Sequence, residues 1–135
     1  MPVDLSWHQP GRVIYERFYD AVTIEELTAI QERFFQFLLE GQAPVHSIID
    51  LSAVRSYPKS INQVRQALKP DQTGKGGRVV LVVGTNAVIR FITSMISQIS
   101  FKNAQFTFCS TLDESIAYLR QIDPSVTVES MGFNS

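Results

Sequence analysis

The sequence of 135 residues has a single cysteine, Cys109, and only two histidines. One cysteine excludes an internal disulfide framework, and the two histidines belong to no cluster with the spacing of a metal site. No apolar run approaches the roughly 20 residues that a helix needs to cross a bilayer, and the N-terminal stretch MPVDLSWHQPG lacks a basic start followed by an apolar segment. We therefore expect a soluble, cytoplasmic protein with no transmembrane segment, no metal and no cofactor.

The sequence does contain enough apolar material for one core. Hydrophobic residues make up 44% of the chain, and its length suits one domain better than two. Internal repeats and low-complexity tracts are absent from the sequence. We predict one domain over residues 1–125, followed by a loosely held C-terminal tail over residues 126–135.

Five segments are predicted to be strands, and the second of them is rich in β-branched and aromatic residues. The first two are joined by a Pro10-Gly11 turn, which predicts an antiparallel hairpin. The fourth, VVLVV, is apolar at every position, which predicts a strand covered on both faces at the centre of the sheet. The predicted strands are Asp4–His8, Arg12–Tyr19, Val45–Leu51, Val79–Val83 and Gln105–Cys109.

Four helices are predicted from their capping residues. The first and the last begin with a T-x-x-E capping box, in which the threonine and glutamate side chains each satisfy a free backbone N–H. The first helix ends at Gly41, and prolines end the second and the last. The residues predicted to cap the four helices are Thr23, Ser60, Asn86 and Thr111.

Strands separated by helices predict an α/β fold. We expect a single two-layer domain with a mixed, mostly parallel five-stranded sheet, an N-terminal antiparallel hairpin and about four helices. The pattern includes four stretches, GRVIYERFYDAVTIEEL, HSIIDLSAVRSYPKS, VVLVVGTN and TLDESIAYLRQI. Together they resemble the STAS superfamily, whose best-known members are bacterial anti-sigma factor antagonists. The resemblance spans roughly residues 5 to 122 and implies a small α/β domain that regulates other proteins by binding them, without enzymatic activity.

The resemblance also implies a candidate phosphoacceptor. In this superfamily a serine at the start of the second helix is sometimes phosphorylated, and that position corresponds to Ser60. The chain has Pro58-Lys59-Ser60-Ile61 there instead of the usual Asp-Ser-Ser-Gly run. Phosphate at a helix N-terminus would meet free N–H groups and the helix dipole. The alternative is that Ser60 only caps the helix.

Three further side chains have the setting of a functional group. Asp50, at the predicted end of the third strand, resembles the acceptor aspartate of receiver domains, but the acidic pair and the lysine that such domains need are missing. We expect Asp50 to accept backbone N–H bonds in a turn, and His46 to be a structural side chain. Cys109 lies among aromatic residues on a strand, a setting that indicates a buried, inert thiol.

Basic residues concentrate in the middle of the chain. Residues 1–50 hold three basic and eight acidic side chains, residues 51–102 hold eight and one, and residues 103–135 hold one and four, so their net charges are −5, +7 and −3. The middle segment suits an acidic protein or an anionic small ligand, or else pairs with the acids of the first helix. Nucleic acid is not expected, because few aromatic residues accompany these charges. The candidate anion- or partner-binding residues are Arg55, Lys59, Arg65, Lys69, Lys75 and Arg78.

The first predicted helix is apolar over more of its surface than a core contact requires. Its apolar residues cover roughly 200° of the helical wheel, against the roughly 100° that faces a core. Such an excess often marks an interface and predicts a homodimer, for which the candidate residues are Phe35, Phe37 and Leu39. The rival function is a binding protein for a small apolar or anionic ligand, or an enzyme, using a pocket between helices and sheet.

Overall fold

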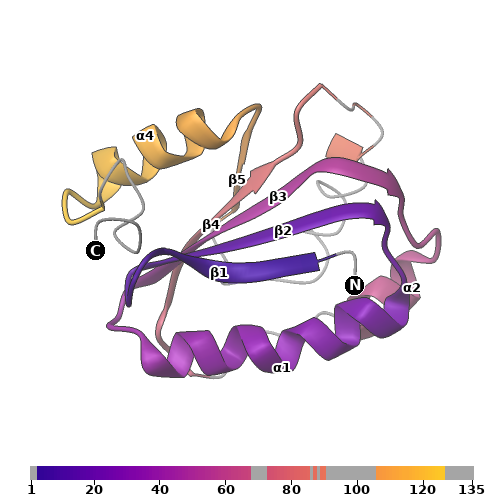
Figure 1. The fold of residues 1–135 in the computed structure, drawn as a ribbon, viewed down its shortest axis with the longest axis horizontal. Coiled ribbons are helices and arrows are strands. Elements are labelled where there is room, and N and C mark those ends of the chain that lie inside the picture. Colours follow the sequence, from indigo (N-terminus) through magenta and orange to yellow (C-terminus); the bar gives the residue numbers. More distant parts are fainter. Residues whose placement is uncertain (1–2, 68–72, 86, 88, 91–105, 127–135) are drawn as a thin grey trace.

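The computed structural model describes residues 3–67, 73–85, 87, 89–90 and 106–126 (Figure 1). Their strands form one five-stranded sheet in the order β1-β2-β3-β4-β5. β1 and β2 are antiparallel, and all later neighbours are parallel, which confirms the predicted mixed sheet with an N-terminal hairpin. The strands are β1 (Val3–Gln9), β2 (Val13–Ala21), β3 (Val45–Ser56), β4 (Gly76–Val82) and β5 (Phe106–Cys109).

Three helices lie in the described part of the chain: α1 (Ile24–Glu40), α2 (Ile61–Ala67) and α4 (Leu112–Ile122). This is fewer than the predicted four, and the helix predicted to start at Asn86 falls mostly outside the described residues. Val126, the first residue of the predicted tail, is buried against the core, while residues 127–135 lie outside the description. None of the described helices is long and apolar enough to span a membrane.

The predicted starts of α1 and α4 are confirmed by their capping contacts. At α1 the Thr23 side chain accepts from the Glu26 N–H at 3.2 Å, and the Glu26 carboxylate accepts from the Thr23 N–H at 3.2 Å. At α4 the Thr111 side chain accepts from the Glu114 N–H at 3.1 Å. The Glu114 carboxylate, however, accepts from the Ser110 N–H, one residue earlier than a capping box requires.

Helices cover both faces of the sheet, which makes three layers instead of the predicted two (Figure 1). Along β3, Leu51 packs in one cluster with Leu27 of α1, while Ile48 packs in another with Leu119 of α4. We call these two faces the α1 side and the α4 side. Helical periodicity shows which side of a helix is buried but not which face of a sheet it meets, and for that reason the prediction of two layers was wrong.

The central strand of the sheet is β3, not β4 as the VVLVV run predicted. β4 lies one position from the edge, which is formed by β5. Its residues are still buried on both sides, Val80 and Val82 toward α4 and Leu81 toward α1. Because helices cover both faces, a strand can be apolar at every position without being central. β3 also runs five residues beyond its predicted end at Leu51, to Ser56.

Candidate functional site

The α4 side of the sheet carries a polar region on β1 and β2. α4 packs on β3, β4 and β5. On β2 the side chains of the same side beyond the buried Val13 are polar or aromatic and half-buried, and Asp4 and Ser6 beside them on β1 are exposed. We call this region the open face, and it consists of Asp4, Ser6, Tyr15, Arg17 and Tyr19.

Arg17 is the positive centre of the open face. Its neighbours across the strands are Asp4 on β1 and Asp50 on β3. Its guanidinium carbon lies 5.1 Å from the centre of the Tyr19 ring, a cation–π contact that holds the long side chain against the sheet. Arginine beside tyrosine is a combination enriched at the centres of protein interfaces.

Asp50 is buried beneath this face and its carboxylate accepts three hydrogen bonds. The Tyr15 hydroxyl donates to Oδ2 at 2.8 Å, while the Ser52 N–H and hydroxyl donate to Oδ1 at 3.0 and 2.6 Å. The predicted role as an acceptor of backbone N–H is therefore confirmed. The bonds form inside β3, where Arg17 pairs with Asp50 but Tyr19 pairs with Ala53, so that a bulge replaces the predicted turn.

The contact with Asp50 also fixes the chemistry of Tyr15. Burial first, and then the hydrogen bond to the Asp50 carboxylate, raise the pKa of the phenol well above its ordinary value. Tyr15 therefore stays protonated and acts as a donor rather than as a nucleophile. Among the described residues no three His, Cys, Asp or Glu side chains lie together in a way that could hold a metal ion.

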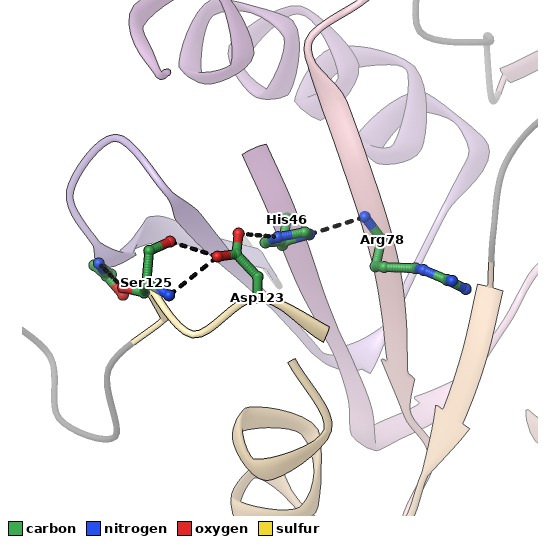
Figure 2. A network of polar contacts seen from close by, with 5 residues as sticks. His46, Arg78, Asp123 and Ser125 are labelled. Carbon is green, nitrogen blue, oxygen red and sulfur yellow. Dashed lines mark hydrogen bonds and ion pairs between the residues drawn. The ribbon is translucent and has the colours of Figure 1, made fainter. Parts of the chain in front are cut away.

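His46 lies in a hydrogen-bond network near the amino end of β3 (Figure 2). Its Nδ1 accepts from the Arg78 N–H at 3.0 Å, which leaves Nε2 to donate to Asp123 Oδ2 at 2.9 Å. Because both ring nitrogens are occupied, His46 is not free to take a proton from a substrate. Gly77 permits this arrangement, since a Cβ there would lie 2.6 Å from Nδ1.

The other oxygen of Asp123 extends this network to β1. Oδ1 accepts from the Ser125 N–H at 3.0 Å and from its hydroxyl at 2.7 Å, and the Gln9 side chain donates to the Ser125 carbonyl at 2.8 Å. The hydrogen bonds from Ser125 first, and then the one from His46, lower the pKa of Asp123 to about 2. The network thus fastens the end of α4 to the sheet, which agrees with the structural role predicted for His46.

Glu16 lies on the α1 side of β2, inside the core. Its neighbours across the strands are Leu5 and Ile49, and it is 3% exposed. Its Oε2 atom has no hydrogen-bond partner in the described structure. Burial raises the pKa of this carboxyl to about 8, so the group is mainly protonated at neutral pH.

Tyr57 is a second polar group of the same region. It lies in the loop between β3 and α2 and packs against the core cluster on the α1 side. Burial, and next the charge of Glu16, raise the pKa of its phenol to about 12. Tyr57 is therefore a neutral hydroxyl group, close enough to Glu16 to be affected by its charge.

The alternation of side chains along β2 contained the signal for Glu16. Residues two apart on a strand share a side, so Glu16 follows Ile14 and precedes Phe18, both buried. The sequence prediction placed the strand but did not assign its residues to the two faces of the sheet, and it therefore missed Glu16. It also missed the open face, whose members come from two strands and whose register depends on the hairpin.

Ser60 has the capping role predicted for it. Its hydroxyl accepts from the Gln63 N–H at 3.2 Å at the start of α2. That contact satisfies one of the free donors of the first turn, as a helix cap does. The capping role accounts for the serine, and its phosphorylation stays a prediction.

The candidate basic residues lie at two ends of the sheet. Arg55 is exposed near the carboxyl end of β3, whereas Arg78 is near the amino end of β4 and level with His46. Nine strand residues separate the two positions, which is roughly 30 Å. Lys59 is exposed and follows β3, Lys75 precedes β4, and Lys69 and the Arg65 side chain lie outside the described part.

Lys75 has a specific task at the end of α1. Its ammonium donates to the Leu39 carbonyl at 2.6 Å and to the Gly41 carbonyl at 2.9 Å. The last turn of α1 holds no basic residue of its own, so Lys75 supplies the positive charge that a helix C-terminus favours.

The three candidate dimer residues have different surroundings. Phe37 stacks on Trp7 of β1, with ring centres 5.1 Å apart. Phe35 is half-buried and meets Phe34 edge to face at 6.1 Å. Leu39 is 60% exposed. The described chain thus covers part of the apolar excess of α1 with its own first strand, and Leu39 is the residue left most accessible.

Three polar groupings therefore stand out, and they differ in what they can bind. The His46 network is closed on itself, with each ring nitrogen paired. The open face is accessible to a macromolecule, while Glu16 is enclosed and can meet only a small molecule. Comparison with protein-family models gives no match for this chain, and comparison with curated proteins gives none either.

Proposed function

We propose that this chain is a non-enzymatic regulatory or protein-interaction module of the STAS-like type. The observation that carries the proposal is the open face, where Arg17 is held against Tyr19 beside Tyr15 on an accessible part of the sheet. Tyrosine and arginine contribute disproportionately to binding energy at protein interfaces, because they bury much area and lose little freedom when already held.

The polar groups of the α4 side favour binding over catalysis. The carboxylate of Asp50 is occupied by Tyr15 and Ser52, and the phenol of Tyr15 keeps its proton. His46 has no free ring nitrogen. A general base needs an accessible lone pair at the substrate, whereas the Asp50 carboxylate is buried with three hydrogen bonds already accepted and both nitrogens of His46 are paired.

The partner is another protein or a second copy of the chain, and the location proposed is the cytoplasm. The charges of the open face indicate its chemistry: Asp4 and Arg17 lie side by side, so a partner surface with both signs is favoured over one that is uniformly acidic. The STAS-like resemblance supports regulation as the purpose of such binding.

Photo-crosslinking inside cells tests this function. A photoreactive amino acid at Ser6, on the open face, is expected to form one dominant adduct, while the same group at Glu32, exposed on α1, is not. Replacing Arg17 by Ala should remove the Ser6 adduct, and replacing the exposed Arg33 by Ala should leave it. Equal adduct yields at Ser6 and Glu32 would contradict the proposal. So would a Ser6 adduct that persists in the Arg17→Ala variant.

A further inference from the structure

The Glu16 carboxyl is a polar group without a structural task. It is 3% exposed, its Oε2 has no partner in the described structure, and its cross-strand neighbours Leu5 and Ile49 are apolar. Leaving such a group buried and unpaired costs free energy that an apolar residue in the same place would not. By contrast, Glu26 caps α1 and Glu114 bonds the backbone before α4. Glu16 is therefore the carboxyl whose burial is best explained by a binding role.

The surroundings of Glu16 restrict the chemistry of what it can bind. The buried cluster on the α1 side consists of apolar residues, and Tyr57, which packs against it, is a neutral hydroxyl. Among the described residues no lysine or arginine is buried. A carboxyl in such a place keeps its proton, so it offers an O–H donor to its partner. The matching ligand group is a neutral acceptor, and the rest of the ligand must be apolar.

We propose that a small neutral apolar molecule binds beside Glu16, between the sheet and the α1–α2 layer, with its carbonyl oxygen accepting a hydrogen bond from the Glu16 carboxyl. This function would go beyond binding at the open face, since Glu16 and Arg17 point to opposite sides of β2. Asp50 and its partners are likewise on the other side of the sheet.

Access to Glu16 is most easily opened at Tyr57 and α2. Over its described residues α2 spans seven residues against 17 in α1, its described buried side chains are Val64 and Ala67, and Tyr57 lies in the loop before it. A short helical segment separates from a core at lower cost than a long one such as α1. Ligand entry by displacement of this segment leaves the sheet and α1 in place.

Nuclear magnetic resonance on protein carrying carboxyl-labelled glutamate measures the contact directly. The probes are decan-2-one, decylamine and decanoate, which share a chain and differ in headgroup charge. At about pH 6 we expect decan-2-one to move the Glu16 resonance and to bind at least about tenfold more tightly than the two charged probes. Its affinity should fall as the pH rises above about 8, because an ionised carboxylate no longer donates.

Matched variants separate Glu16 from general apolar binding. Glu16→Leu removes the donor and should weaken decan-2-one binding about tenfold, while Glu16→Gln retains an N–H donor and should recover part of the affinity. Glu32→Leu, on the exposed surface of α1, should change nothing. Circular dichroism establishes that each variant is folded, and the resonance of the unmodified Glu16 gives a readout that needs no variant.

Several results would overturn the site. A Glu16 resonance that no probe moves would mean that a buried water alone serves the carboxyl. Equal affinity of the ketone for Glu16→Leu and the unmodified protein would place binding elsewhere. Tighter binding of decylamine with rising pH would show an ion pair, and the ligand class would then be cationic instead of neutral.

Discussion

Raising the pH from about 4 to about 8 is expected to destabilise the fold through Glu16. The pKa of this carboxyl is about 8 in the folded chain against an ordinary 4.5, so the unfolded state loses its proton first. In that interval the unfolded state is the one that binds fewer protons, and stability falls as the pH rises. The stabilising contribution of Glu16 is fully present below the pKa of the unfolded state and is lost progressively as the pH rises to the pKa of the folded state.

The magnitude follows from the two pKa values. Each pH unit between them is worth about 1.4 kcal/mol, which gives a loss of roughly 4 kcal/mol by pH 8. Small domains are stable by only about 5 to 15 kcal/mol, so this one side chain would remove a large part of the total. Because Glu16 is 3% exposed, solvent screening does little to reduce the effect.

Urea unfolding followed by circular dichroism at a series of pH values measures this loss. The unmodified protein is compared with Glu16→Gln, which cannot ionise, and the difference between their unfolding free energies isolates Glu16 from the other carboxyls. Glu32→Gln serves as the control, because Glu32 is exposed on α1 and its variant should follow the unmodified protein.

If the difference in unfolding free energy between the unmodified protein and Glu16→Gln stays constant from about pH 4 to about pH 8, the reasoning is refuted. It would mean that Glu16 ionises at the same pH in both states, and hence that water or a polar group reaches it in the folded chain. A difference that changes in the opposite direction would mean that the folded state stabilises the carboxylate.

Three further predictions concern the cap, the network and the self-association of α1. Ser60→Ala should cost about 0.5 to 2 kcal/mol in urea unfolding and leave partner binding intact; unchanged stability together with partner loss in Ser60→Asp would favour a phosphorylation switch instead. Asp123 has a lowered pKa of about 2, so its contribution is present above its ordinary 3.8 and is lost as the pH falls toward 2; acid titrations should show that loss in the unmodified protein and not in Asp123→Asn. Analytical ultracentrifugation should find a dimer that Leu39→Glu dissociates, and a monomer at micromolar concentration would contradict self-association.

Features set by neighbouring residues were predictable from the sequence. The box at Thr23 and Glu26 and the cap at Ser60 form between residues three apart, so their spacing alone specifies the contact. The hairpin was likewise indicated by the turn between its strands. Glu16 belongs to this group too, because its place between Ile14 and Phe18 marks it as an inward position.

Features that join distant parts of the chain were not predictable in this way. Lys75 caps α1 from a position 34 and 36 residues away, and it had been assigned to a possible anion site on charge alone. The contact between His46 and Asp123 spans 77 residues. The side of the sheet that α4 covers depends on where the chain crosses after β5, and periodicity carries no information about that choice.

The His46 network has a consequence for the order in which the chain can fold during synthesis. Through Gln9 and Ser125 it connects residues 116 positions apart, so the first hairpin must wait for nearly the whole chain before this contact forms. Until α4 arrives, Ile48, Val80 and Val82 lack the cover that this helix gives to their side of the sheet. A ribosome-bound intermediate of this protein would therefore expose an apolar sheet face, and it is at this stage that a chaperone would have the most surface to protect.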